Sequence, residues 1–138
     1  APAARVFAVY DEAYSTRPGS PGWSEEVWVS ALTDDEAFRP DLSLLVSVDG
    51  QDVGYAITHV EADGVGWIVQ MGVRPEWRRK GIAGALLATL MQRYQIAGLK
   101  IAALDVNTNN PGAASVYARL GFCRVRRYTS YQKVISRA

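Results

Sequence analysis

The fold is decided by one stretch of the sequence, Val69-Gln70-Met71-Gly72-Val73-Arg74-Pro75-Glu76-Trp77-Arg78-Arg79-Lys80-Gly81-Ile82-Ala83-Gly84-Ala85-Leu86-Leu87. It begins as an apolar strand, passes through a turn at a proline, and continues through a basic, glycine-rich segment into an amphipathic helix. The first N–H groups of a helix have no internal partner, and the helix dipole adds partial positive charge there. The glycines let a ligand approach the backbone, and the nearby arginines and lysine supply charge. The stretch therefore predicts a site for a phosphate or pyrophosphate group.

Composition places the chain among ordinary globular domains. A length of 138 residues with 49% hydrophobic residues suits a single domain over residues 1–138. A net charge of +1 gives no overall field that would favour nucleic acid or an acidic membrane. Because Cys123 and His59 are the only soft ligands, we expect no metal site. No apolar run reaches the ~18 residues that span a bilayer and no signal-peptide pattern is seen, so we expect no membrane association and a cytoplasmic location.

Hydrophobic periodicity and turn residues predict two helices, three strands, a helix, a strand, a helix and two strands, in that order. This order is typical of one α/β domain. The predicted helices cover residues 5–14, a segment from the N-cap Ser24 to the region 33–38, a segment from Ile82 to Gly98, and a segment from Pro111 to Gly121. The predicted strands cover residues 42–48, 53–60, 65–73 and 100–106, and a hairpin lies within 122–135.

Two short motifs refine the phosphate site. Residues 78–83 fit the pattern [Q/R]-x-x-G-x-[G/A] between a strand and a helix, whereas the dinucleotide pattern G-x-G-x-x-G and the P-loop pattern are absent. A second segment, Asn110-Pro111-Gly112-Ala113-Ala114-Ser115-Val116-Tyr117-Ala118-Arg119-Leu120-Gly121-Phe122, fits N-x-x-A-x-x-x-Y-x-x-x-G-F. In this order the two motifs resemble those of the GCN5-related N-acetyltransferases (GNAT), and the resemblance covers residues 65–122.

The resemblance implies an α/β (α+β) fold with a mixed, largely antiparallel twisted sheet flanked by helices. Two parallel strands of that sheet splay apart to hold coenzyme A. Domains of the family normally begin with a strand, which this chain lacks before its first predicted helix. The sequence is therefore expected to be a fragment, one half of a tandem protein, or a chain that pairs with a second copy, because an unfilled sheet edge favours pairing with another chain.

The resemblance also implies acetyl-CoA as cosubstrate, with no metal. Backbone groups of the strand would pair with the pantetheine arm, and N–H groups of the glycine-rich segment would hold the pyrophosphate. The cofactor-binding residues expected on this basis are Met71, Gly72, Val73, Arg78, Arg79, Lys80, Gly81, Ile82, Ala83, Gly84, Asn110 and Ser115.

The same resemblance assigns chemistry to Tyr117, which occupies the position of the family's general acid. Tyr117 also lies on the apolar face of its predicted helix, so packing alone is the alternative explanation. Some members place a glutamate early on the strand before the glycine-rich segment, and here that position holds Trp67. Glu61 or His59 is the expected substitute, as a base or as a residue that positions a water molecule.

Aromatic residues outside the motifs suggest an acceptor pocket. Aromatic rings attract cationic amines, and in this family the first two helices and the last strands shape that pocket. The predicted function is acetyl-CoA-dependent transfer of an acetyl group directly to a primary amine of a small molecule or of a peptide or protein. The alternative is a non-catalytic CoA-binding or regulatory domain, and a nucleic-acid module is not favoured because only Trp77 could stack on bases beside the cations. The acceptor residues expected are Trp23, Trp28 and Tyr128.

Overall fold

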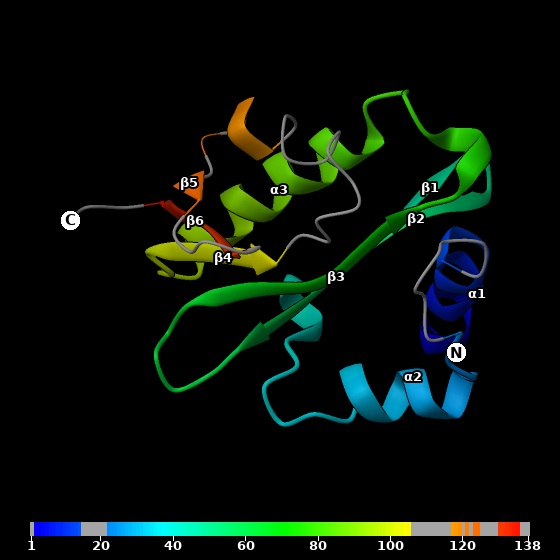
Figure 1. Cartoon of the computed structure of the whole chain (residues 1–138), viewed down its shortest axis with the longest axis horizontal. Helices are drawn as coiled ribbons and strands as arrows, with labels where there is room; N and C mark the ends of the chain where they lie inside the picture. The colour runs from blue at the N-terminus through cyan, green and yellow to red at the C-terminus, as the bar shows by residue number, and fades with distance from the viewer. Residues whose placement is uncertain are drawn as a thin grey trace.

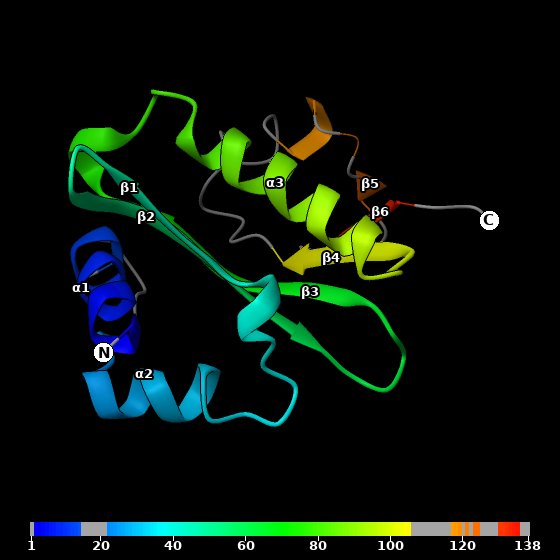
Figure 2. The same ribbon diagram turned by 180° about the vertical axis from the view of Figure 1, so that it is seen from behind.

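The computed structural model describes residues 2–14, 22–105, 117–119, 121, 123–124 and 130–135. One mixed sheet of six strands, in the order β1-β2-β3-β4-β6-β5, separates two layers of helices (Figures 1 and 2). Among the strands of these described residues, only the pair β3–β4 is parallel, so the predicted mixed and largely antiparallel sheet is confirmed. The strands are β1 Leu44–Val48, β2 Gln51–Val60, β3 Gly66–Val73, β4 Ile101–Asp105, β5 Cys123–Arg124 and β6 Ser130–Val134; the helices are α1 Pro2–Tyr14, α2 Glu25–Leu32 and α3 Ile82–Ile96, with 3₁₀ turns at Pro40–Leu42 and Pro75–Trp77.

Local signals explain where most elements begin and end. Ser24 caps α2, since its hydroxyl accepts a hydrogen bond from the N–H of Val27. The β1–β2 hairpin turns at Asp49 and Gly50, both with positive φ (50° and 80°), as a two-residue turn of this type requires. The strand predicted from residue 42 begins two residues later, because Pro40–Leu42 forms a 3₁₀ turn in which Ser43 N–H bonds back to the carbonyl of Pro40.

Two hydrophobic cores lie on opposite faces of the sheet, and β3 contributes to the packing of both layers. One core joins α3 to the sheet and includes Ile68, Leu87 and Tyr94. The other joins α1 and α2 to the sheet and includes Tyr10, Trp28 and Tyr55. These residues are almost fully buried. The central strand is therefore fixed from both sides.

The parallel strands β3 and β4 pair over only three positions. Their register runs from Gly66↔Ala102 to Ile68↔Leu104 and then stops, although β3 continues to Val73 (Figure 1). A β-bulge lies at the same point, because the β2–β3 register passes from Thr58↔Ile68 to Ile57↔Gln70 and leaves Val69 without a partner of its own. The two strands therefore part just beyond Ile68, as the resemblance predicts.

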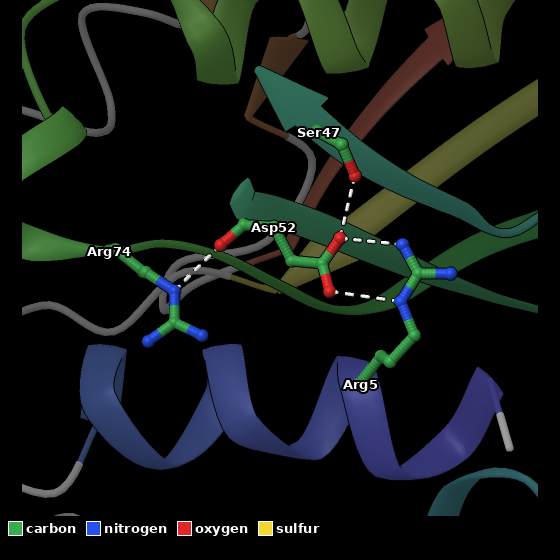
Figure 3. Close-up of polar contacts among 4 residues, drawn as sticks. All are labelled: Arg5, Ser47, Asp52 and Arg74. Carbon is green, nitrogen blue, oxygen red and sulfur yellow. Dashed lines mark hydrogen bonds and ion pairs between the residues drawn. The ribbon is translucent and has the colours of Figure 1, made fainter. Parts of the chain in front are cut away.

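An ion-pair network fastens α1 to the edge hairpin (Figure 3). Arg5 on α1 donates two hydrogen bonds, of 3.0 and 2.7 Å, to the carboxylate of Asp52, which also accepts one of 2.6 Å from the Ser47 hydroxyl. Arg74 donates from Nε to the Asp52 carbonyl at 2.7 Å and forms an ion pair with Glu12. The network holds α1 against β2 and the end of β3.

The Arg5–Asp52 pair predicts a small pH-dependent change in stability. Hydrogen bonds from Arg5 and Ser47 lower the pKa of Asp52 to about 2. The pair therefore stabilises the fold fully above the unfolded-state pKa of about 3.9 and loses this contribution as the pH falls toward 2. We expect Arg5→Ala to lower the free energy of unfolding at pH 6, with the difference from the unaltered chain shrinking between pH 4 and pH 2. Urea titrations at several pH values measure this, and a constant difference would contradict it.

Candidate active site

The parting of β3 and β4 opens the sheet along the second half of β3. Beyond Ile68, the described part of the chain places no strand against the β4-facing edge of β3. On its other edge, Met71 pairs with Ala56 and Gly72 with Tyr55. The Tyr14 hydroxyl donates a 2.5 Å hydrogen bond to the carbonyl of Met71, which fixes the strand from the α1 side. The opening thus exposes an edge of β3 on which the Met71 carbonyl is already bonded to Tyr14, and backbone N–H groups are the ones that can pair with an extended chain.

A glycine-rich turn connects this strand to α3, and we call residues 79–84 the cradle. Arg79 and Gly81 both have left-handed backbones, with φ of 63° and 81°. Gly81 caps α3 without a side-chain hydrogen bond, and Ala85 is the first residue whose N–H bonds back along the helix, to the carbonyl of Gly81 at 3.0 Å. A Cβ atom added at Gly81 or Gly84 would meet nothing within 4 Å. The cradle therefore combines unbonded helix N–H groups with open space, and it fits a pyrophosphate.

The four cations of this region fall into two pairs. Arg74 is held by Glu12 and Asp52, and Arg78 donates to the carbonyls of Val73 at 3.2 Å and Ala13 at 2.9 Å. Arg79 and Lys80 are exposed. The Lys80 ammonium lies 5.2 Å from the centroid of the Trp77 ring. The first pair joins the segment just before the cradle to α1, and the second pair provides the charge that faces solvent at the start of α3.

The second motif is described only in part. Residues 117–119 form a helical turn, and the half-buried Tyr117 packs against the core on the α3 side of the sheet. Asn110 and Ser115, predicted to bind the cofactor, lie outside the described residues, as does Tyr128. The position of Tyr117 agrees both with a role as general acid and with a role in packing alone.

The two predicted substitutes for a base lie toward the far end of the β2–β3 pair. His59 is only 8% exposed, and its Nε2 lies 2.8 Å from the carbonyl oxygen of Leu32. Because a carbonyl oxygen can only accept, Nε2 carries the hydrogen and has no lone pair to offer. Glu61 is exposed and follows Val60, the partner of Gly66. Five residues of strand at ~3.3 Å each separate Gly66 from Met71, so Glu61 lies about 16 Å from the level of Met71.

Sequence reasoning missed one acidic position, Asp105. It is the last residue of β4 and follows Leu104 directly, the residue that makes the final parallel pair with Ile68. Its backbone therefore stands where the two strands part. The sequence does show a lone acidic residue directly after the apolar run 101–104. Only the register of β3 and β4 shows that this residue lies where the two strands separate.

The predicted acceptor residues differ in their accessibility. Trp23 is half-buried and stacks on Tyr10, with ring centroids 6.4 Å apart. Trp28 is fully buried, and its indole N–H donates a 2.7 Å hydrogen bond to Oε1 of Gln70. Any influence of Trp28 on an acceptor would therefore pass through Gln70, a residue that sequence reasoning had not placed in the site.

Two kinds of feature are absent from the described part of the chain. Residues 2–14, 22–105 and the short described segments after them contain no group of three or more side chains suited to hold a metal ion. No helix among these residues has both the length and the apolar character needed to cross a membrane.

Comparison with known proteins agrees with the motifs and the fold. Residues 5–122 match the model of the acetyltransferase (GNAT) family, so the chain belongs to this family. A mycothiol acetyltransferase from Streptomyces avermitilis is 37% identical over 86 residues, which cover 62% of this chain and 28% of that protein. The [ribosomal protein bS18]-alanine N-acetyltransferase of Escherichia coli is 29% identical over 100 residues, covering 72% of this chain and 64% of the relative.

Solved structures extend the similarity to nearly the whole chain. The crystal structure of the ribosomal-protein-S18-alanine N-acetyltransferase from Escherichia coli superposes with a TM-score of 0.79 at 25% identity, over 99% of this chain and 88% of that one. A GNAT family acetyltransferase from Brucella melitensis, solved in complex with acetyl-CoA, shares the fold with a TM-score of 0.74 at 22% identity, over 97% and 82% of the two chains. The chain spans only 28–45% of the length of the mycothiol acetyltransferases that it matches.

Proposed function

We propose that this chain is an acetyl-CoA-dependent N-acetyltransferase that transfers the acetyl group directly to a primary amine of a small molecule or of a peptide or protein. The observation that carries the proposal is the opening between β3 and β4, which leads into the cradle at the start of α3. The chain belongs to the GNAT family, and its relatives are named acetyltransferases; both findings support the same activity.

The residues present suit acetyl-CoA as a cosubstrate. Backbone groups of Met71, Gly72 and Val73 would pair with the pantetheine arm, and N–H groups of residues 79–84 would hold the pyrophosphate. In the reaction the amine nitrogen attacks the thioester carbon, the carbon–sulfur bond breaks, and the amine loses a proton. Backbone N–H groups near Met71 would stabilise the charge that develops on the thioester oxygen. Tyr117 would donate a proton to the thiolate.

A base must take up the proton that the amine loses, and three residues are candidates for this base. We favour Asp105, because its backbone lies where the strands part, over Glu61 and His59. We expect Asp105→Asn to lower kcat by at least about tenfold, and Glu61→Gln to change it by less than about threefold. Initial rates over pH 6–9 measure both variants. The reverse order of effects would assign the role to Glu61 and refute the choice of Asp105.

The proposal is tested in two steps. Isothermal titration calorimetry of the folded protein with acetyl-CoA is expected to show saturable binding, and absence of binding would refute the proposal. Release of free thiol from acetyl-CoA is then followed during a screen of primary amines. Binding without turnover on any amine would favour the alternative, a non-catalytic CoA-binding or regulatory domain.

We also propose that the domain acts beside a partner, either a second copy or a further domain of a tandem protein. In the described part of the chain the outer edge of β1 has no neighbouring strand, and an apolar groove between β1 and α3 runs beside it, lined by Leu44, Val46, Ile82 and Leu86 among others. Light scattering after size-exclusion chromatography distinguishes a monomer from a homodimer.

A further inference from the structure

Gln70 occupies a special position at the opening between β3 and β4. It follows the bulge residue Val69, two residues after the last position at which β3 pairs with β4. Its side chain contacts Trp28 and Tyr55, so it lies on the α1–α2 face of the sheet, opposite α3. The cradle belongs to the start of α3. A cosubstrate held there leaves the α1–α2 face as the side from which an acceptor can approach the opening.

The orientation of the Gln70 amide follows from the chemistry of its two partners. The indole N–H of Trp28 can only donate, so the atom that it contacts at 2.7 Å must be the amide oxygen. The Tyr55 hydroxyl lies 2.7 Å from that oxygen and therefore donates as well. Trp28 and Tyr55 are both fully buried. Two rigid donors thus fix the oxygen of the amide and, with it, the direction of the nitrogen.

The amide nitrogen, in contrast, has no acceptor among the residues that the structure describes. Gln70 is half-buried, and the described hydrogen bonds of its side chain are the two to its amide oxygen. With its oxygen held by two donors, Nε2 has a fixed direction and offers N–H donors that no described residue accepts. A partly buried donor whose partner is supplied by a ligand discriminates strongly between ligands that have an acceptor atom and ligands that lack one.

We propose that Gln70 selects the acceptor by donating a hydrogen bond to a carbonyl group that is attached to the carbon bearing the reacting amine. This inference rests on the proposed acetyltransferase function. Gln70 is adjacent to Met71, at the level where the thioester would react, so we infer that it binds an acceptor atom close to the amine nitrogen. An α-aminoacyl group, as in a peptide N-terminus or an aminoacylated small molecule, has its carbonyl this close to the amine nitrogen. The amine of a lysine side chain does not.

The aromatic residues around Gln70 agree with this acceptor class. Tyr10 lies between Trp28 and Trp23, with ring centroids 6.0 and 6.4 Å away, and stacks on Tyr14 at 5.3 Å. This row continues from the Gln70 contact to the half-buried Trp23. Trp28 and Tyr10 are buried, so Trp23 and Tyr14 are the members of the row that can form an apolar wall for the side chain on the α-carbon and attract the cationic amine before it loses its proton.

The test uses Gln70→Glu with two matched acceptors. Glutamate keeps an oxygen for Trp28 and Tyr55 but replaces the amide NH₂ with a second oxygen, which cannot donate. The acceptors are alanine amide and 2-aminopropane, which has a methyl group in place of the carboxamide. We expect the unaltered chain to prefer alanine amide, and the ratio of the two kcat/KM values to fall by at least about tenfold in Gln70→Glu. Comparing ratios between variants removes the difference in basicity of the two amines.

The outcomes separate this inference from the function on which it rests. If the unaltered chain acetylates neither amine nor any other amine, the proposed function fails. If it acetylates amines and the ratio is the same in Gln70→Glu, the function stands and the role of Gln70 is refuted. Should Gln70→Glu fail to fold, Tyr55→Phe removes one of the two donors that orient the amide. We expect that variant to lower the ratio about threefold without loss of acetyl-CoA binding, and an unchanged ratio would again refute the inference.

Discussion

Replacing Gly81 with glutamate is expected to abolish acetyl-CoA binding. Gly81 precedes α3, whose first N–H groups are the ones proposed to hold the pyrophosphate. A side chain there would enter open space in the absence of ligand, because nothing lies within 4 Å of its Cβ. With ligand present, the carboxylate would occupy the pyrophosphate position and repel its charge. We expect affinity to fall by at least about a thousandfold, since both contact and charge are lost, as measured by calorimetry.

Gly64 offers a matched control for this change. It has a similarly left-handed backbone, with φ of 73° against 81° for Gly81, and a Cβ atom added there would also meet nothing within 4 Å. It lies in the turn before β3, at the end opposite the cradle. Gly64→Glu should therefore lose a similar amount of stability through backbone strain and still bind acetyl-CoA. Retained binding in Gly81→Glu would show that the cradle is not the pyrophosphate site.

Removing the hydroxyl of Tyr117 is expected to lower turnover by about 10²-fold or more with little change in acetyl-CoA binding. A general acid contributes chiefly to the chemical step, because it protonates the leaving thiolate, whereas the ring can still pack against the α3-side core. Pre-steady-state thiol release and calorimetry on Tyr117→Phe measure the two quantities separately.

Tyr94 is the control for the packing explanation of Tyr117. It belongs to the same core, and its hydroxyl lies 2.5 Å from the Thr58 hydroxyl in a fully buried pair. Burial raises the pKa of Tyr94, so this group stays protonated. Tyr94→Phe should reduce stability and leave turnover nearly unchanged. If Tyr117→Phe behaves in the same way as Tyr94→Phe, Tyr117 is a packing residue and the general acid must lie elsewhere.

The parts of the site that depend on neighbours in the sequence could be predicted from it. The cradle follows from glycines and cations placed between a strand and a helix, and the order of elements follows from their periodicity. The N-cap at Ser24 and the turn at Asp49 and Gly50 are equally local. Each of these features is decided by residues within a few positions of one another.

Features that depend on distant partners could not be predicted. The guanidinium of Arg78 donates a hydrogen bond to the carbonyl of Ala13, 65 positions earlier in the chain, and no local pattern indicates this partner. The orientation of Gln70 depends on Trp28, 42 positions away. The location of Asp105 at the end of the β3–β4 pairing depends on the register between two strands that a helix separates in the sequence. Sequence shows which groups are available, but such pairings arise only when the sheet assembles.

The single strand β3, which lies between two separate cores, has a consequence for how this chain can diversify. On the proposed function, substitutions on its α1–α2 face, around Gln70, would alter which amines are accepted, while residues on the α3 face and in the cradle would keep their contacts with acetyl-CoA. Acceptor preference and affinity for acetyl-CoA would then change independently of each other. Such a layout would let new acceptors be recruited through a few changes in α1, α2 and one face of one strand, with no need to rebuild the acetyl-donor site.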